Sequence, residues 1–396
     1  GMSDYIKKEL KVKALVTGTQ IDYSPPHVQA KLDYVDKHGY WCHPKVGNGW
    51  SIRNVPMVNS MGTVVQMAGL RVHDKPFTIS ECSEPFPSQY GAEFQPMMRA
   101  YGALQGWDGV FAYTYNHASD FEPQRTSYFF HFLARTDVLA HLPACAAMYL
   151  RGDVREAQRT VVGAVGYPTY FDRLVTARSI PAGIGSAGFD GRLGLIHKTA
   201  VDLTGKKGMD PGSVPKPEGK VLVSDTGELT WNNEQPGAAY WTVNTPNTKV
   251  FTGYPKGRTI SLGSVTLAIG RTRLDWATVS LVSRHATGFG ESPGRPASIL
   301  LAATGVSGNE GAVIERLSDT DITFRDRKAW GDGAVLVEGV PATVTLPSNP
   351  DRTKCFALGP DGSRKGEVSV GKVDGDGAKI LIGPAYETVW YEIEVE

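Results

Sequence analysis

The order in which strand-like and helix-like segments follow one another is the feature that most constrains the fold of this chain. Up to residue 150, strand-like runs alternate with helical patterns in four βα units, which is typical of a parallel sheet. After residue 150, helical periodicity disappears and short strand-like runs are separated by Gly, Pro and Asp turns, as in an all-β sandwich. The sequence therefore predicts an α/β region at residues 1–150 and a β-sandwich region at residues 151–396, with a loop or linker at about 204–220.

The segment Lys75–Glu81, with the sequence KPFTISE, has the β-branched and aromatic residues of a buried strand and ends on a carboxylate. The carboxyl ends of parallel strands carry the catalytic groups of α/β barrels. Glu81 is therefore the first catalytic candidate, and a solvated Glu at a strand end is the ordinary alternative.

Composition argues against several classes of partner. Lys plus Arg and Asp plus Glu both total 41 among 396 residues, so the chain has no formal net charge and offers no basic stripe for nucleic acid. No apolar run approaches the roughly 20 residues of a membrane helix, and the first residues lack the apolar core of a signal peptide. We therefore expect neither a nucleic acid nor a membrane partner, and a secreted protein would need a leader upstream of residue 1.

Three segments form a combination that resembles a known family. They are residues 34–41 (YVDKHGYW), 75–81 (KPFTISE) and 100–110 (AYGALQGWDGV). Together they resemble the last four βα units of retaining glycoside hydrolases in the clan whose barrels resemble those of cellulases and β-galactosidases. The resemblance covers about residues 5–150. It implies the C-terminal half of a (β/α)8 TIM barrel, with strands equivalent to 5–8, a following β-sandwich, and a function in the hydrolysis of O-glycosyl bonds of oligo- or polysaccharides.

The resemblance also implies roles for single residues. Glu81 takes the position of the nucleophile at the end of the seventh strand. His38 and Tyr40 match a His-x-Tyr of the sixth strand, whose Tyr contacts the nucleophile. Tyr113 and Tyr115 are the candidates for an aromatic floor under the sugar. The expected substrate-binding residues are His38, Tyr40, Trp41, Trp50, Tyr113, Tyr115 and Asp36.

Other motifs are interpreted more simply. Asp36, His38 and His43 have the residue types of a metal site, but such residues more often hydrogen-bond hydroxyls in a sugar site. The GxGxxG at residues 183–188 has no βα context and predicts a turn-rich loop. The four cysteines are widely spaced without a CxxC pair, which predicts neither a zinc site nor a disulfide framework. We expect no cofactor and no metal.

The chain departs from the family at the general acid. The family places an Asn-Glu at the end of its fourth strand, whereas the only Asn-Glu pairs here, Asn233–Glu234 and Asn309–Glu310, lie in the β region. A full barrel takes roughly 250 residues, and residues 5–150 supply about half. We therefore expect either that upstream sequence has been lost or that a second chain completes the barrel, and autonomous activity is doubtful. Glu84 and Asp36 are weak candidates for the second carboxyl of a retaining mechanism.

Three expectations follow for the structure. Glu81, His38, Tyr40 and Tyr115 should converge on one cleft, because parallel strands deliver their carboxyl ends to one face. An apolar inner face of the half-barrel should be covered by a second copy, giving a homodimer, or by the β region folding back. The alternative function is a non-catalytic carbohydrate-binding or structural protein that uses its β domain.

Overall fold

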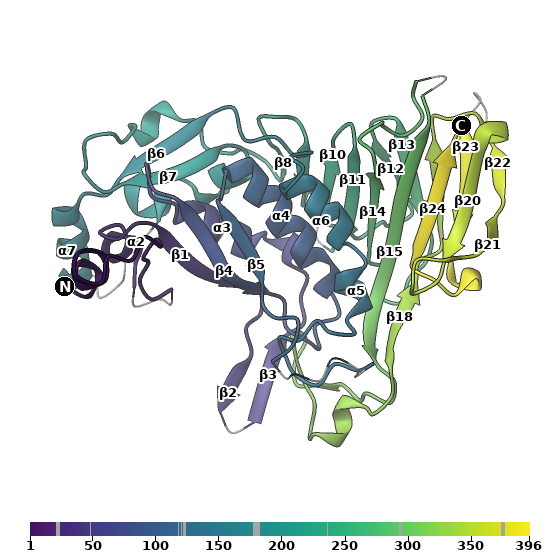
Figure 1. Ribbon diagram of the computed structural model, residues 1–396, viewed down its shortest axis with the longest axis horizontal. Coiled ribbons are helices and arrows are strands. Elements are labelled where there is room, and N and C mark those ends of the chain that lie inside the picture. The colour runs from purple at the N-terminus through teal and green to yellow at the C-terminus, as the bar shows by residue number, and fades with distance from the viewer. Residues whose placement is uncertain are drawn as a thin grey trace.

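The computed structural model describes the chain except for a few short gaps. The described residues are 1–20, 24–47, 49–117, 119, 121, 124–176, 183–235, 237–292, 295–373 and 377–396. Figure 1 shows four layers: a small parallel sheet, a helical layer, a large antiparallel sheet and a smaller antiparallel sheet.

The parallel sheet has the strand order β1–β4–β5. These strands are β1 (Val35–Tyr40), β4 (Phe77–Ser83) and β5 (Gly109–Ala112). Helices connect them: α3 (Gly62–Gly69) follows β1, and α4 (Phe94–Gln105) follows β4. Their side chains fill one face of the sheet, where Val35, Phe77 and Ile79 are completely buried. Helix α4 ends where Gly106 adopts a left-handed conformation with φ of 60°.

The other face of the parallel sheet is polar. Asp36 is buried there and accepts hydrogen bonds from the hydroxyls of Thr78 and Ser80 and from the Ser80 amide. Farther along the sheet, the Phe111 side chain is 58% exposed. This face therefore lacks the continuous apolar surface that a second set of barrel strands would cover.

The prediction of a half TIM barrel is wrong. Three parallel strands pair in this sheet instead of four, and residues 12–19 form no regular element. The described chain is mostly β, in several sheets, and contains no closed barrel. The homodimer was argued from an apolar inner face, and the polar face seen here removes that argument.

The large antiparallel sheet has ten strands, and its two faces are covered by different layers. Its strands are β8 (Val221–Val223), β9 (Leu229–Asn232), β10 (Tyr240–Asn244), β11 (Thr248–Gly253), β14 (Ala277–Ser283), β15 (Ala297–Asn309), β18 (Val335–Gly339), β20 (Thr353–Leu358), β21 (Arg364–Val368) and β24 (Trp390–Val395). Strand β15 lies between β14 and β24, and β18 pairs with the C-terminal part of β15.

A five-stranded antiparallel sheet packs on one face of the large sheet. It comprises β12 (Thr259–Leu262), β13 (Val265–Ile269), β19 (Ala342–Leu346), β22 (Val370–Lys372) and β23 (Ala378–Ile382). Leu267 and Val344 of this sheet share one buried core with Phe251, Ile299 and Leu301 of the large sheet. Alternating apolar residues on the strands produce this core, as they do in sandwiches generally.

The helical layer packs on the opposite face of the large sheet. This layer includes α5 (Thr136–Leu139) and α6 (Leu142–Tyr149). Between them, buried His141 contacts the hydroxyls of Ser280 on β14 and Thr304 on β15, each at 2.8 Å. Burial lowers the pKa of His141 to about 4, so the imidazole is neutral at pH 7.

Smaller elements complete the fold. A four-stranded sheet joins β2 (Lys45–Gly47) and β3 (Gly49–Arg53) to β16 (Glu315–Arg316) and β17 (Asp321–Thr323), and so connects distant parts of the sequence. Apart from short 3-10 helices, the remaining elements of the described residues are α1 (Met2–Asp4), a π-helix (Tyr5–Glu9), α2 (Pro26–Gln29), α7 (Tyr167–Thr176) and the parallel pair β6 (Thr160–Ala164) and β7 (Lys198–Asp202). Helix α7 lies where the sequence predicted only strands. In the described part of the chain, no helix is both long and apolar enough to cross a membrane.

Candidate functional site

The carboxyl ends of β1 and β4 bring three of the expected site residues together. The register pairs His38 with Glu81 across the two strands, two residues before both strands end. His38 Nδ1 lies 3.2 Å from Glu81 Oε2, and the Tyr40 hydroxyl donates a hydrogen bond to the same oxygen. Three of the four residues predicted to converge on one cleft therefore lie together, but neither of the two cavities described below contains Glu81. We call these residues, together with Tyr113, the Glu81 site.

The Glu81 carboxylate is held on one side and open on the other. Its side chain is 29% exposed and that of His38 is 19% exposed. Burial and the hydrogen bond to Glu81 raise the pKa of Tyr40, so Tyr40 remains a proton donor at any ordinary pH. Both contacts use Oε2, and no residue in the described part of the chain donates a hydrogen bond to Oε1.

Aromatic rings surround the ring of Tyr40, whose hydroxyl binds this carboxylate. The ring of Tyr40 has its centroid 5.0 Å from that of Phe130, 5.1 Å from that of His43 and 6.5 Å from that of Tyr113. Burial and the negative charge of Glu81 raise the pKa of Tyr113. Sequence reasoning missed Phe130, and it considered His43 as a metal ligand or, more readily, as a group that hydrogen-bonds sugar hydroxyls. The run of aromatic residues at 128–131 was the available signal, but nothing local indicated that this loop returns to Tyr40.

A chain of hydrogen bonds leads away from Tyr113. The Tyr113 hydroxyl lies 2.8 Å from His117 Nε2, and His117 Nδ1 lies 2.7 Å from His131 Nε2. The backbone N–H of His117 also donates to His131 Nε2, at 3.1 Å, so this nitrogen must be an unprotonated acceptor. His131 is therefore neutral and His117 carries its proton on Nδ1. Burial and neighbouring His117 lower the pKa of His131, which agrees with this assignment. Nε2 of neutral His117 then accepts a hydrogen bond from the Tyr113 hydroxyl.

Four other expected site residues lie outside the Glu81 site. Buried Asp36 is occupied by Thr78 and Ser80, as described above, and does not orient His38. Tyr115 stacks on Phe121 and is 45% exposed, so the predicted convergence fails for this residue.

The two tryptophans expected to bind sugar are also outside this group. The Trp41 indole donates to the Val55 carbonyl at 2.7 Å and lies against Arg53. Trp50 packs in a separate aromatic cluster, with ring centroids 4.6 Å from Phe129 and 5.8 Å from Trp330.

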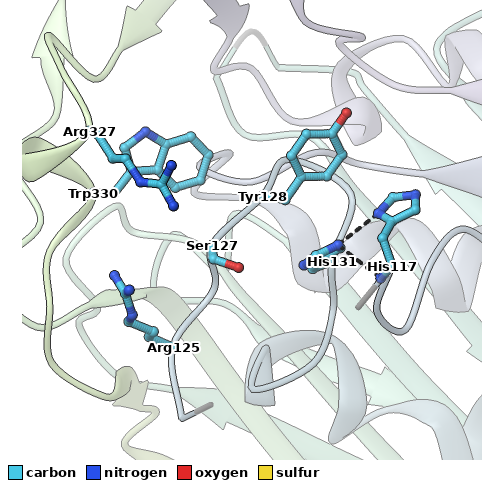
Figure 2. Close-up of a pocket in the computed structure, with 7 residues that line it drawn as sticks. All are labelled: His117, Arg125, Ser127, Tyr128, His131, Arg327 and Trp330. Carbon is cyan, nitrogen blue, oxygen red and sulfur yellow. Dashed lines mark hydrogen bonds between the residues drawn. The ribbon is translucent and has the colours of Figure 1, made fainter. Parts of the chain in front are cut away.

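Two cavities adjoin one another beyond Tyr113. The first has a volume of about 550 Å³, and its wall consists of His117, Arg125, Ser127, Tyr128, His131, Arg327 and Trp330 (Figure 2). We call it the arginine pocket. The second has a volume of about 740 Å³ and contains Trp50, and both cavities share Arg327 and Trp330. Glu81 does not line either cavity; Tyr113 and His117 connect it to the first.

Glu84, the other carboxyl considered for catalysis, is inaccessible to a ligand. Its side chain is buried and accepts a hydrogen bond from Ser88 Oγ, while its Oε2 has no partner among the described residues. Burial raises the pKa of Glu84 to about 8, against opposing contributions from Ser88 and Arg135. Burial and the nearby Glu84 also raise the pKa of Glu93 well above its ordinary value. Glu84 is thus a structural group.

The buried pair Glu84 and Glu93 should make stability depend on pH. For Glu84, the stabilising state is the protonated one: stability is complete below the ordinary pKa of 4.5 and is lost as pH rises through about 8. The shift corresponds to a loss on the order of 5 kcal/mol. We expect Glu84→Gln, which mimics the neutral acid, to lose less stability between pH 5 and pH 8.5 in urea unfolding. Equal losses in the variant and the unmodified protein would contradict this assignment.

The described residues contain no cluster of three or more His, Cys, Asp or Glu that could hold a metal ion. The four cysteines are free thiols. Comparison with protein-family models, curated proteins and solved structures found no match. The function must therefore be argued from the geometry of the Glu81 site.

Proposed function

We propose that this protein acts on carbohydrates as a retaining glycoside hydrolase, with Glu81 as the nucleophile. The observation that carries the proposal is the asymmetry of the Glu81 carboxylate. Tyr40 and His38 contact Oε2, and no described residue donates a hydrogen bond to Oε1. A positioned carboxylate with one free oxygen is what attack on an anomeric carbon requires.

The reaction would proceed in two steps. Glu81 Oε1 attacks the anomeric carbon, the bond from this carbon to the leaving oxygen breaks, and the leaving oxygen takes a proton. Water then attacks the same carbon, the bond to Glu81 breaks, and the proton of the water passes through Tyr113 to neutral His117. Retaining enzymes normally use a second carboxyl as the proton donor, but the polar contacts of Glu81 come from Tyr40 and His38.

Tyr113 is the candidate proton donor in this arrangement. When His117 is protonated on both nitrogens, its Nε2–H donates to the Tyr113 oxygen and the Tyr113 proton is free for the leaving group. His117 then returns a proton to Tyr113 through their 2.8 Å contact. Because a tyrosine is a weaker acid than a carboxylic acid, we expect turnover mainly of glycosides with good leaving groups.

Mechanism-based labelling tests the proposal directly. A 2-deoxy-2-fluoro glycoside with a dinitrophenolate leaving group should form a stable ester on Glu81, found by peptide mass spectrometry. The sugar is not known, so a panel of such glycosides is needed. If no glycoside labels the protein although saccharides bind to it, the result supports the second candidate function, a non-catalytic carbohydrate-binding protein. The lack of a second carboxyl beside Glu81 among the described residues is the observation that favours this candidate.

Removing the hydroxyl that holds Glu81 should weaken catalysis without removing the nucleophile. In Tyr40→Phe, Oε2 loses a donor, and we expect the kcat/KM for aryl glycosides to fall by about a hundredfold. Labelling should still reach one ester per chain, only more slowly. Tyr240→Phe, on β10 in the large sheet, is the matched control and should keep full activity. An unchanged rate in Tyr40→Phe would show that Oε2 needs no donor.

A further inference from the structure

We propose that the arginine pocket binds an anionic substituent of a saccharide, a carboxylate or a sulfate ester, so that acidic saccharides are the substrates of the Glu81 site. This inference rests on the function proposed above and specifies the substrate class. Its first support is the charge of the pocket. None of the described residues in its wall is acidic, although the chain as a whole has no formal net charge.

The two guanidinium groups of the pocket are largely available to a ligand. Arg327 is exposed, and its side chain makes no hydrogen bond or ion pair with any other described residue. Arg125 donates to the Gly331 carbonyl at 3.3 Å and lies 3.7 Å from Asp332, whose side chain is 98% exposed. Such an exposed ion pair is weak, so Arg125 can turn to a bound oxyanion at little cost. Arginine is well suited to this use because its planar group can bind two oxygens at once.

The opposite wall adds neutral donors and aromatic rings. In Figure 2, Arg125 and Arg327 lie on one side of the pocket, and His117 and His131 lie on the other. The pair of histidines carries at most one positive charge, because His131 Nε2 must remain an acceptor. The rings of Tyr128 and Trp330 offer apolar faces to the C–H groups of a sugar ring. A charged group and a sugar ring can thus be bound together.

The pocket adjoins the Glu81 site through direct contacts. Tyr113 hydrogen-bonds to His117 in the wall of the pocket, and the Tyr113 ring faces Tyr40. A second connection runs through Phe130, whose ring centroid is 5.9 Å from that of Tyr128 and 5.0 Å from that of Tyr40. An oligosaccharide that reaches Glu81 can therefore place a neighbouring unit in the pocket.

The position of the pocket is fixed by a buried side chain. Asn309, at the end of β15, is 5% exposed and makes three hydrogen bonds to backbone atoms. It accepts from the Thr126 amide at 2.9 Å and donates to the Thr126 carbonyl at 2.7 Å and to the Trp330 carbonyl at 2.9 Å. Thr126 and Trp330 belong to the two walls that carry Arg125 and Arg327. This bracing gives the pocket a defined width.

Calorimetric titration of the Glu81→Gln variant, which binds without turnover, tests the inference. The probes are oligogalacturonate with its methyl ester, and a sulfated galactan oligosaccharide with its desulfated form. We expect at least one acidic probe to bind about tenfold more tightly than its neutral partner, and more weakly as salt rises. Arg327→Gln and Arg125→Gln should each remove about tenfold of that affinity. Arg325→Gln, whose side chain lines the second cavity and not this pocket, is the matched control.

The two acidic probes distinguish a carboxylate ligand from a sulfate ligand. Equal binding of both acidic probes and their neutral forms would overturn the inference, as would unchanged affinity in both arginine variants. Labelling of Glu81 by the fluoro glycoside is independent of these results. If acidic probes bind through the arginines but Glu81 is never labelled, the pocket stands and the proposed hydrolysis fails.

Discussion

Glu81→Gln is expected to lower the turnover of aryl glycosides by about a thousandfold or more, because an amide cannot attack the anomeric carbon. Folding should be unaffected, since the Glu81 side chain is partly exposed and glutamine has the same shape. Initial rates with dinitrophenyl glycosides, compared with thermal unfolding of the same samples, give the measurement. Binding of saccharides should persist in the variant.

Two controls make this experiment specific to Glu81. Glu84→Gln makes the same chemical change three residues away in a buried structural carboxyl, and it should retain activity. Glu81→Ala should regain turnover when azide is added, because a small anion can enter the space of the lost side chain and attack in its place. Activity that survives in Glu81→Gln would refute the assignment of the nucleophile.

Arg135→Met should destabilise the fold by about 3–5 kcal/mol, the largest stability effect we expect of a single substitution here. Arg135 and Asp137 form a buried ion pair with a 2.7 Å contact and side-chain exposures of 2% and 3%. Arg135 also donates to the Glu84 carbonyl at 3.1 Å. Removing the cation leaves Asp137 as a buried, uncompensated charge. Urea unfolding at pH 7 measures the loss.

A comparison pair shows whether burial causes that loss. Arg192 and Asp190 have the same two-residue separation and a 2.7 Å contact, but their side chains are 40% and 22% exposed. We expect Arg192→Met to cost about 1 kcal/mol or less. The double variant Arg135→Met, Asp137→Leu should recover part of the stability lost in Arg135→Met. A loss in Arg135→Met no greater than that in Arg192→Met would contradict the role given to burial.

Local patterns in the sequence identified the elements that carry the Glu81 site. The run at 75–81 predicted β4 well, because the local side-chain pattern decides such a strand. The convergence of Glu81, His38 and Tyr40 then followed from a general property of parallel sheets, whose strands end on one side. The prediction for Tyr115 was wrong because β5 ends at Ala112, so Tyr115 lies outside the sheet.

The number of strands that pair, and what covers each face, could not be read locally. The half-barrel prediction assumed that both faces of the parallel sheet were apolar, but Asp36, Thr78 and Ser80 satisfy one another on one face. Helix α7 was missed because glycine- and proline-rich flanking sequence hides its short amphipathic pattern. The arginine pocket joins residues near 125 to residues near 330, and no local signal links segments that are so far apart.

Strand β15 has a consequence for how such a protein can change its specificity. Its first half lies in the sandwich core, with Ile299 and Leu301 completely buried, and its last residue is Asn309. The Asn309 side chain hydrogen-bonds only to backbone atoms of the loops, at Thr126 and Trp330. Neighbouring positions such as 125, 127 and 327 can therefore exchange side chains while the loops keep their course. The sandwich supplies a rigid frame on which new ligand preferences can evolve without refashioning the frame itself.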